Sequence, residues 1–206
     1  MPTLLHLDSS PLETSISREL GREFVKTWKA VHPDGPVIYR DLAASAPKPL
    51  DAQWIFAAFT PEEAQTPDQA VALALSDELI DELEAADEYV IGVAMHNFSI
   101  PSVLKLWIDQ VVRKDSTFTY NESGFVGLLK EKKATVLVAS GGVYDAGTPA
   151  AGFNFIEPYL KFLLGFIGVN DVKFVTAGGT SQIRMGVIDR ETLLKPVLER
   201  VREVAA

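Results

Sequence analysis

The residues best suited to hold a flat polar ligand lie in one short segment, between an apolar run at residues 89–95 and an amphipathic stretch. That segment reads Met95-His96-Asn97-Phe98-Ser99-Ile100-Pro101. The amide of Asn97 can hydrogen-bond a ligand, and the ring of Phe98 can cover a planar group. Ligands of parallel α/β sheets bind beyond the carboxyl ends of the strands. A ligand site is therefore predicted at this turn.

A second candidate follows the first apolar run and carries hydroxyls at five of ten positions, Asp8-Ser9-Ser10-Pro11-Leu12-Glu13-Thr14-Ser15-Ile16-Ser17. Free N–H groups at a helix start, together with hydroxyls, can bind a phosphate without any positive side chain. Alternatively, these hydroxyls only cap the helix and form turns. The segment lacks G-x-G-x-x-G and G-x-x-x-x-G-K-[ST], which disfavours a dinucleotide site or a P-loop hydrolase and favours a mononucleotide phosphate.

A third candidate follows the apolar run at residues 134–139 and reads Ser140-Gly141-Gly142-Val143-Tyr144. Paired glycines let the backbone approach a ligand closely and present its N–H groups, although they are also common in plain turns. If the strands are parallel, all three loops lie at the same edge of the sheet. Their convergence is stronger support for a site than any one of them.

The elements that position these loops follow an alternating β and α rhythm. Strand-like runs are predicted at 3–7, 37–39, 89–95, 134–139 and 172–177, each separated by enough chain for a crossover helix. Helices are predicted at 17–31, 70–85, 101–111, 153–167 and 189–204. Residues 43–66 are predicted to be a long connection, and the aromatic segment 117–126 a hairpin flap.

Apolar periodicity predicts which helix faces are buried. The first helix should bury Leu20, Phe24, Trp28 and Val31, the second Val71, Leu75, Leu79 and Leu83, and the third Leu104, Trp107, Ile108 and Val111. The acidic residues between 77 and 84 are interpreted as a solvated face rather than a metal site, because no histidine accompanies them.

Composition limits the classes of function. The chain has 206 residues without cysteine, which excludes disulfides and thiolate catalysis and fits a reducing, cytoplasmic compartment. A net charge of −9 disfavours nucleic-acid binding. Neither a secretory signal nor a membrane-length apolar run is predicted. Without repeats or a change in composition, residues 1–206 are expected to form one domain.

Taken in order, these motifs resemble the FMN-dependent NADH azoreductases, flavodoxin-like quinone reductases called acyl-carrier-protein phosphodiesterase-like in older naming. The resemblance spans nearly the whole chain. The residues that carry it are Ser9-Ser10, Ser15-Ile16-Ser17, Met95-His96-Asn97-Phe98 with Pro101 and Leu104-Lys105, Thr117-Phe118-Thr119-Tyr120, Ser140-Gly141-Gly142, and Tyr159 with Leu164-Gly165-Phe166-Ile167-Gly168.

The resemblance implies an α/β fold, a flavodoxin-like three-layer sandwich with a five-stranded parallel sheet of order 2-1-3-4-5 and a hairpin insertion before strand 4. It implies a bound FMN, with NADH or NADPH as the hydride donor and quinones or aromatic azo compounds as acceptors in a ping-pong reaction. It also implies a homodimer with active sites at the interface.

The same resemblance implies roles for individual residues. The FMN phosphate would be held by Ser10, Ser15, Ile16 and Ser17, and the ribityl chain and ring by Met95, His96, Asn97 and Phe98. The pyrimidine edge would face Ser140, Gly141 and Gly142, and the substrate pocket would include Tyr120, Tyr144, Phe162 and Leu163. No side chain is expected to be catalytic, because FMN carries the chemistry.

Three positions depart from the family pattern and concern substrate range, namely Ser140, Tyr144 and Leu163. For His96 we favour a structural role over proton donation, and we expect His6 and His32 to be packing or surface residues.

The main alternative function is a non-catalytic flavodoxin-like electron carrier with a protein redox partner. A further alternative is a cofactor-free binding or regulatory module, because fold alone does not determine function.

Overall fold

The computed structural model describes residues 1–122 and 124–206. Five parallel strands form its central sheet in the order β2-β1-β3-β6-β7. The strands are β1 (Leu4–Asp8), β2 (Val37–Asp41), β3 (Glu88–Ala94), β6 (Lys133–Ala139) and β7 (Asp171–Ala177). Strands β6 and β7 are the fourth and fifth parallel strands of the chain, so this order is the predicted 2-1-3-4-5. The predicted sheet is therefore confirmed.

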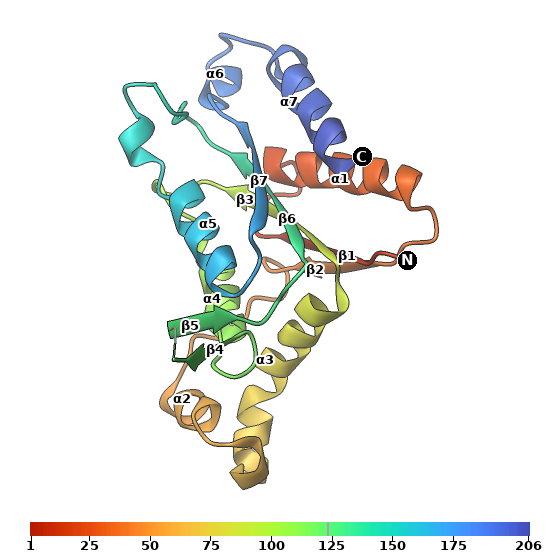
Figure 1. The fold of residues 1–206 in the computed structure, drawn as a ribbon. Coiled ribbons are helices and arrows are strands. Elements are labelled where there is room, and N and C mark those ends of the chain that lie inside the picture. Colours follow the sequence, from red (N-terminus) through yellow and green to blue (C-terminus); the bar gives the residue numbers. More distant parts are fainter. Residues whose placement is uncertain (123) are drawn as a thin grey trace.

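Helices cover both faces of the sheet, which gives the three predicted layers (Figure 1). One face carries α1 (Ile16–Val31) and α7 (Arg190–Ala205), and the other carries α3 (Pro67–Ala85), α4 (Ser102–Val111) and α5 (Ile156–Phe166). The shorter elements are α2 (Ala52–Ala58), η1 (Glu62–Ala64), η2 (Ala151–Phe153) and α6 (Ser181–Arg184).

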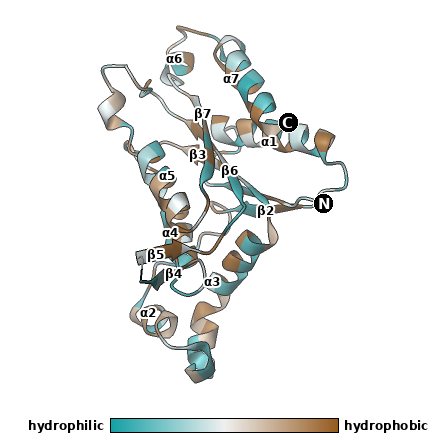
Figure 2. Cartoon of the chain, in the orientation of Figure 1, coloured by the Kyte–Doolittle hydropathy of each residue, from teal (hydrophilic) through white to brown (hydrophobic). Residues whose placement is uncertain are grey.

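The alternation of side chains along the strands builds two cores. Leu4 packs with α1 and α7, whereas its neighbour Leu5 packs with the helices of the other face. Figure 2 shows hydrophobic and hydrophilic residues interleaved along the helices, as expected when one stripe of each helix faces the sheet. The three central strands β1, β3 and β6 are buried on both faces, so their apolar runs are nearly continuous.

Local signals explain where several helices begin. Thr66 and Gln69 form a reciprocal capping box, and Pro67 occupies the first turn of α3. Asp189 accepts a hydrogen bond from the Thr192 N–H at 2.8 Å and so caps α7. We predicted Pro101 as the first residue of the third helix. Helix α4 instead begins at Ser102, and Pro101 is its N-cap.

Two predictions about the helices were wrong. Residues 43–66 are not only a connection, because Asp51 caps the short helix α2 within them. Val71 was expected in the buried ladder of α3 but is 76% exposed, and Val31 at the end of α1 is 47% exposed. The sheet contacts only part of each helix, so periodic apolar residues beyond its edge stay at the surface.

The predicted hairpin is present as β4 (Phe118–Asn121) and β5 (Gly124–Gly127), paired antiparallel before β6. Ser123, which we placed in its turn, lies outside the described residues. Phe118 and Phe125 both pack against Phe166 of α5, each with ring centroids 4.7 Å apart. The hairpin is therefore attached to α5 through aromatic contacts.

Two further features are absent from the part of the chain that the structure describes. No helix there has the length and apolar character needed to cross a membrane. No group of three or more histidine or acidic side chains there is arranged to hold a metal ion. The expectation of a cytoplasmic location stays a prediction from the sequence.

Candidate functional site

The three candidate loops meet at the carboxyl edge of the sheet and line one cavity of about 380 Å³. Its wall includes predicted residues from the loop after β1, the turn after β3 and the loop after β6, namely Ser10, Ser15, Ile16, Met95, His96 and Gly141. The parallel sheet brings them together because β1, β3 and β6 are adjacent and end at the same edge.

The start of α1 supplies backbone donors at one end of this cavity. Ser15 is the N-cap of α1, but its side chain does not cap the helix and instead lies 3.0 Å from the Ser17 hydroxyl. The first N–H groups of a helix have no partner within the helix, so that of Ile16, which lines the cavity, is available to a ligand. Ser17 is fully buried and does not line the cavity.

The turn after β3 holds two residues in an unusual backbone conformation. His96 and Ser99 exchange two backbone hydrogen bonds of 3.0 Å, which closes a two-residue turn. Asn97 and Phe98 between them have φ angles of 49° and 69°. Positive φ is strained for a residue as large as phenylalanine, and such strain is concentrated at functional sites.

The loop after β6 turns its carbonyl groups toward the segment after β7. The carbonyl of Ser140 accepts from the Thr180 N–H and hydroxyl, both at 3.0 Å, and the carbonyl of Gly141 accepts from the Ser181 hydroxyl at 2.7 Å. In a planar trans peptide the N–H points opposite to the carbonyl. The N–H groups of Gly141 and Gly142 therefore point away from residues 180 and 181.

Aromatic rings pack around the turn after β3, although none of them lines the cavity. The ring of Phe98 contacts Tyr144 at a centroid distance of 6.0 Å and Phe153 at 5.7 Å. The Ser140 hydroxyl donates to the Gly142 carbonyl at 2.9 Å, so it stabilises the loop itself. Tyr144 also packs over Gly142, where a Cβ atom would lie 2.8 Å from the tyrosine ring. Gly142 is thus the residue that lets Tyr144 close over this loop.

Sequence analysis missed a fourth wall, formed by the segment after β7 and the start of α7. The residues that complete the cavity on this side are Thr180, Ile183, Arg184 and Arg190. Arg190 is paired with Glu19 of α1 and donates to the Thr14 carbonyl at 3.4 Å. Gly178-Gly179 after β7 repeats the pattern of Gly141-Gly142 after β6 and was the signal that could have located this wall.

A buried polar network beneath the loop after β1 was also missed. Its centre is Arg18, whose side chain contacts the Ser10 carbonyl and the side chains of Asp8, Asp41 and Tyr39. Burial acts to raise the pKa of Asp8, but interactions with His6, Tyr39 and Arg18 outweigh it and hold that pKa below its usual value. Burial and the Asp8 carboxylate raise the pKa of Tyr39.

The histidines occupy different positions around the site. His96 contributes backbone groups to its turn, and its hydrogen bonds to Ser99 are both from the main chain. His6 is buried in β1, with Nε2 3.7 Å from Asp8 Oδ1, which is too far for a hydrogen bond. His32 packs against Trp28 at the end of α1. The packing roles expected for His6 and His32 agree with these positions.

Nine of the predicted site residues do not line the cavity within this chain, namely Ser17, Asn97, Phe98, Tyr120, Ser140, Gly142, Tyr144, Phe162 and Leu163. Tyr120 on the hairpin and Phe162 on α5 are 61% and 65% exposed, whereas Leu163 packs partly against the core. A larger cavity of about 720 Å³ lies elsewhere, between the segment 58–77 and the loop after α4 at 113–116. None of the predicted site residues lines it.

Comparisons with known proteins show which family the chain belongs to. A family model described as a flavodoxin-like fold matches residues 2–203. A protein of Acidobacterium capsulatum named FMN-dependent NADH:quinone oxidoreductase is 65% identical over all 206 residues, which is 100% of both chains. A protein of the same name from Nostoc punctiforme is 47% identical over 183 residues, 88% of this chain and 89% of its own.

Solved structures are similar over the whole fold. A crystal structure of an azoreductase from Bacillus anthracis superposes with a TM-score of 0.89 at 29% identity, covering 100% of this chain and 99% of its own. An FMN-dependent NADH-azoreductase from the same organism, solved in complex with FMN, has a TM-score of 0.88 at 27% identity and covers 100% and 98%. The chain therefore belongs to the flavodoxin-like family of FMN-dependent NADH:quinone oxidoreductases.

Proposed function

We propose that the protein is an FMN-dependent NADH:quinone oxidoreductase that also reduces aromatic azo compounds, built as one flavodoxin-like domain. The observation that carries the proposal is the convergence of three segments on one cavity: Ser15-Ile16 at the uncapped start of α1, Met95-His96 just after β3, and Gly141 after β6. The strained turn at Asn97-Phe98 follows directly after His96. The names of the relatives supply the chemistry that such a cavity would serve.

The residues present fit an FMN. The start of α1 offers free N–H groups and the positive end of a helix dipole, which suit a phosphate. Arg184, which also lines the cavity, adds positive charge, whereas the charge of Arg190 is paired with Glu19. Gly141 leaves room for a flat ring, since a Cβ atom built on it would find its nearest neighbour 3.8 Å away. The proposed phosphate residues are Ser10, Ser15, Ile16 and Ser17.

When bound, FMN supplies the redox chemistry, accepting a hydride from the nicotinamide and delivering two electrons to the acceptor. The protein contributes position and electrostatics. The N–H groups of Gly141 and Gly142 are suited to donate hydrogen bonds to an edge that gains negative charge. Phe98, held by Tyr144 and Phe153, limits access of water to one side of the site.

We propose NADH as the hydride donor, because the relatives carry NADH in their names. The experiment described below also tests NADPH as a donor. The exposed Arg184 is the candidate for contact with the additional phosphate of NADPH. Donor and acceptor are both planar and would occupy the same space in turn. The proposal therefore includes ping-pong kinetics.

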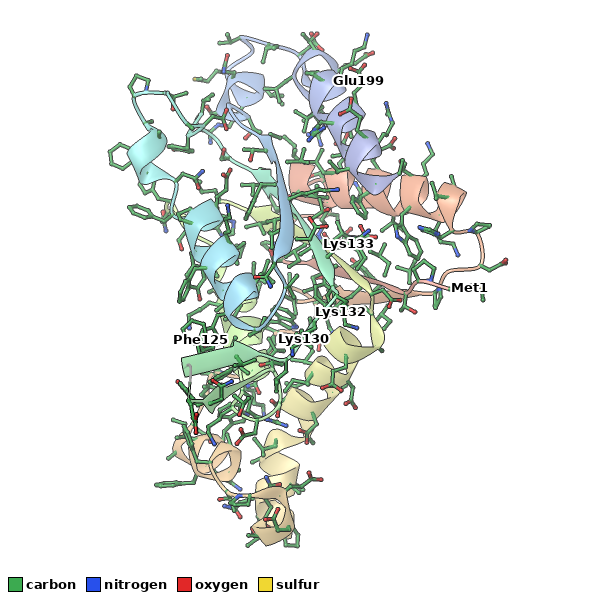
Figure 3. All side chains as sticks on the ribbon, in the orientation of Figure 1. Met1, Phe125, Lys130, Lys132, Lys133 and Glu199 are labelled. Atoms are coloured by element: carbon green, nitrogen blue, oxygen red, sulfur yellow. The ribbon has the colours of Figure 1, made fainter. Side chains whose placement is uncertain are left out.

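The proposal includes a homodimer. Apolar rings remain exposed on the hairpin and on α5, and contiguous exposed apolar surface marks interaction sites. Figure 3 shows Phe125 at the outer edge of β5, and its neighbours Tyr120 and Phe162 are also exposed. In a dimer, these residues would complete the substrate pocket of the partner, which is consistent with their absence from the cavity of their own chain.

The deciding experiment is a visible spectrum of the purified protein after addition of FMN and removal of the excess, followed by anaerobic NADH and then a quinone. We expect bound flavin, loss of its absorbance with NADH, and recovery with quinone. Repeating the donor step with NADPH gives the preference, and steady-state rates over a grid of donor and acceptor concentrations should give parallel reciprocal plots.

Other outcomes identify the alternatives. Bound flavin without reduction by NADH would favour an electron carrier with a protein partner. Failure to retain FMN at micromolar concentrations, with the protein folded by circular dichroism, would favour a cofactor-free module and overturn the proposal.

A further inference from the structure

The side chain of Arg18 does not face the cavity, although it belongs to the first turn of α1. It is 4% exposed and runs back beneath the loop that precedes the helix. Its Nε and Nη2 atoms donate to the Ser10 carbonyl at 2.9 and 2.7 Å. One side chain therefore joins the beginning of the loop to the start of the helix that follows it.

Every donor of this guanidinium is used within the protein. Besides the two bonds to Ser10, Nη2 donates to Asp41 at 2.7 Å, and Nη1 donates to Tyr39 at 3.1 Å and to Asp8 at 3.4 Å. An arginine has five N–H donors, and these bonds occupy all of them. Arg18 has no donor left for a phosphate in the cavity.

The charge of Arg18 is also compensated. Asp8 at the end of β1 and Asp41 at the end of β2 are its two ion-pair partners. The Tyr39 hydroxyl donates to Asp8 at 3.0 Å and fixes the carboxylate that Arg18 contacts. Burying these charges is costly unless they are paired and hydrogen-bonded, so the network holds a defined geometry.

The loop above the network is attached at its base to β3 and to Arg18, and at its far end Arg190 donates to the Thr14 carbonyl at 3.4 Å. The Ser9 hydroxyl donates to the Gly92 carbonyl of β3 at 2.6 Å, and Ser10 is held by Arg18. Residues 11–14 between these attachments and the helix are exposed. The network is also tightly enclosed, because a Cβ atom on Gly92 would lie 2.9 Å from the Asp8 carboxylate.

We propose that Arg18 is a positioning residue for the cofactor phosphate, acting through Ser10, and this inference rests on the proposed binding of FMN. By fixing the Ser10 carbonyl relative to the first turn of α1, Arg18 holds the loop in its phosphate-binding conformation before the ligand arrives. A preorganised loop avoids the entropy cost of ordering on binding. The expected consequence is selectivity for FMN over riboflavin, which has the same ring and no phosphate.

The test compares Arg18→Lys with Arg22→Lys, an exposed arginine one turn later on α1. Lysine keeps the charge of Arg18 but cannot form the planar two-point contact with Ser10. We expect Arg18→Lys to raise the Kd of FMN about tenfold while the Kd of riboflavin changes less than about twofold. Arg22→Lys should change neither Kd, and flavin fluorescence quenching measures both.

A second readout needs no flavin. Hydrogen exchange of the protein without added cofactor should be about tenfold faster at residues 11–17 in Arg18→Lys, with the rest of α1 unchanged. If Arg18→Lys does not fold, Tyr39→Phe is the second variant, because it removes one hydroxyl from the network and should shift both readouts in the same direction by a smaller factor.

The outcomes separate this inference from the proposed function. Absence of FMN binding by the unsubstituted protein would overturn the proposed function. Equal weakening of FMN and riboflavin, or unchanged exchange of residues 11–17 in a folded Arg18 variant, would overturn the positioning role while leaving the proposed function intact.

Discussion

The ring of Phe98 meets the ring of Tyr144 edge to face, with centroids 6.0 Å apart and planes inclined by 80°. Phe98 comes from the turn after β3 and Tyr144 from the loop after β6, so this contact joins two of the three loops that form the candidate site. The backbone of Phe98 has a φ of 69°, a conformation that costs energy for a side chain with a Cβ atom.

Phe98→Gly should be more stable than Phe98→Ala by about 1 kcal/mol, the reverse of the usual order, because glycine adopts positive φ without strain. Both variants lose the ring and should weaken FMN binding by roughly fivefold. Urea unfolding and flavin titration measure the two effects. Tyr144→Phe keeps the ring contact and is the control. Greater stability of the alanine variant would contradict strain at this position.

Ser15→Asp should affect helix stability and flavin binding in opposite directions. Aspartate is a good N-cap and interacts favourably with the helix dipole, so the stability of the protein should rise by about 0.5 kcal/mol. The same charge would repel the phosphate and raise the Kd of FMN at least about tenfold. Ser15→Asn is the neutral control. Unchanged FMN affinity in Ser15→Asp would remove Ser15 from the phosphate site.

Tyr120→Ala should change acceptor kinetics more than cofactor binding, because Tyr120 is exposed and lies outside the cavity of its own chain. We expect kcat/KM for quinones to change about fivefold while the Kd of FMN stays within about twofold. Steady-state assays with several quinones test this, and Tyr120→Phe is the control for the ring. If Tyr120→Ala and the unsubstituted protein have the same kcat/KM for every quinone, Tyr120 has no role in the pocket.

Phe162→Asp should dissociate the proposed dimer without unfolding the chain, since its ring is 65% exposed. A charge placed in an apolar interface is desolvated without a partner, which costs several kcal/mol. Sedimentation velocity reports the mass. Val31→Asp is the control, because Val31 is exposed at the end of α1 on the other side of the sheet. A dimer that survives Phe162→Asp places the interface elsewhere.

Stability should fall in acid through Asp8. The pKa of Asp8 lies below its usual value of 3.8 in the folded protein, so the unfolded chain binds the proton more readily. The stabilisation is therefore complete above about pH 5 and is lost as pH falls below about 4 through the folded pKa. Urea unfolding from about pH 5 down to about pH 2, through the folded pKa, measures the slope.

Asp8→Asn provides the matched variant for that measurement. It removes one ion-pair partner of Arg18 and should lower stability at neutral pH by about 3 kcal/mol. It should also show a shallower loss of stability in acid than the unsubstituted protein, because one titrating group is absent. An identical acid slope in the two proteins would show that Asp8 is not responsible.

The sequence alone predicted the strands of the sheet, most helices and the hairpin, because strand and helix periodicity is a local property of the chain. The order of the strands in the sheet was predicted from the family resemblance. The sequence also located the three loops, since each joins an apolar run to polar or glycine-rich residues. The assignment of individual residues in those loops to FMN stays a prediction.

Tertiary structure alone decided which distant residues meet at the edge of the sheet. Arg18 looks like a surface residue of an amphipathic helix, and it becomes buried because parallel pairing of β1 with β2 brings Asp41 and Tyr39 beneath the loop. Arg184 and Arg190 reach the cavity because β7 lies beside β6. Contacts between segments far apart in the chain leave no periodic signal, so only the folded arrangement reveals them.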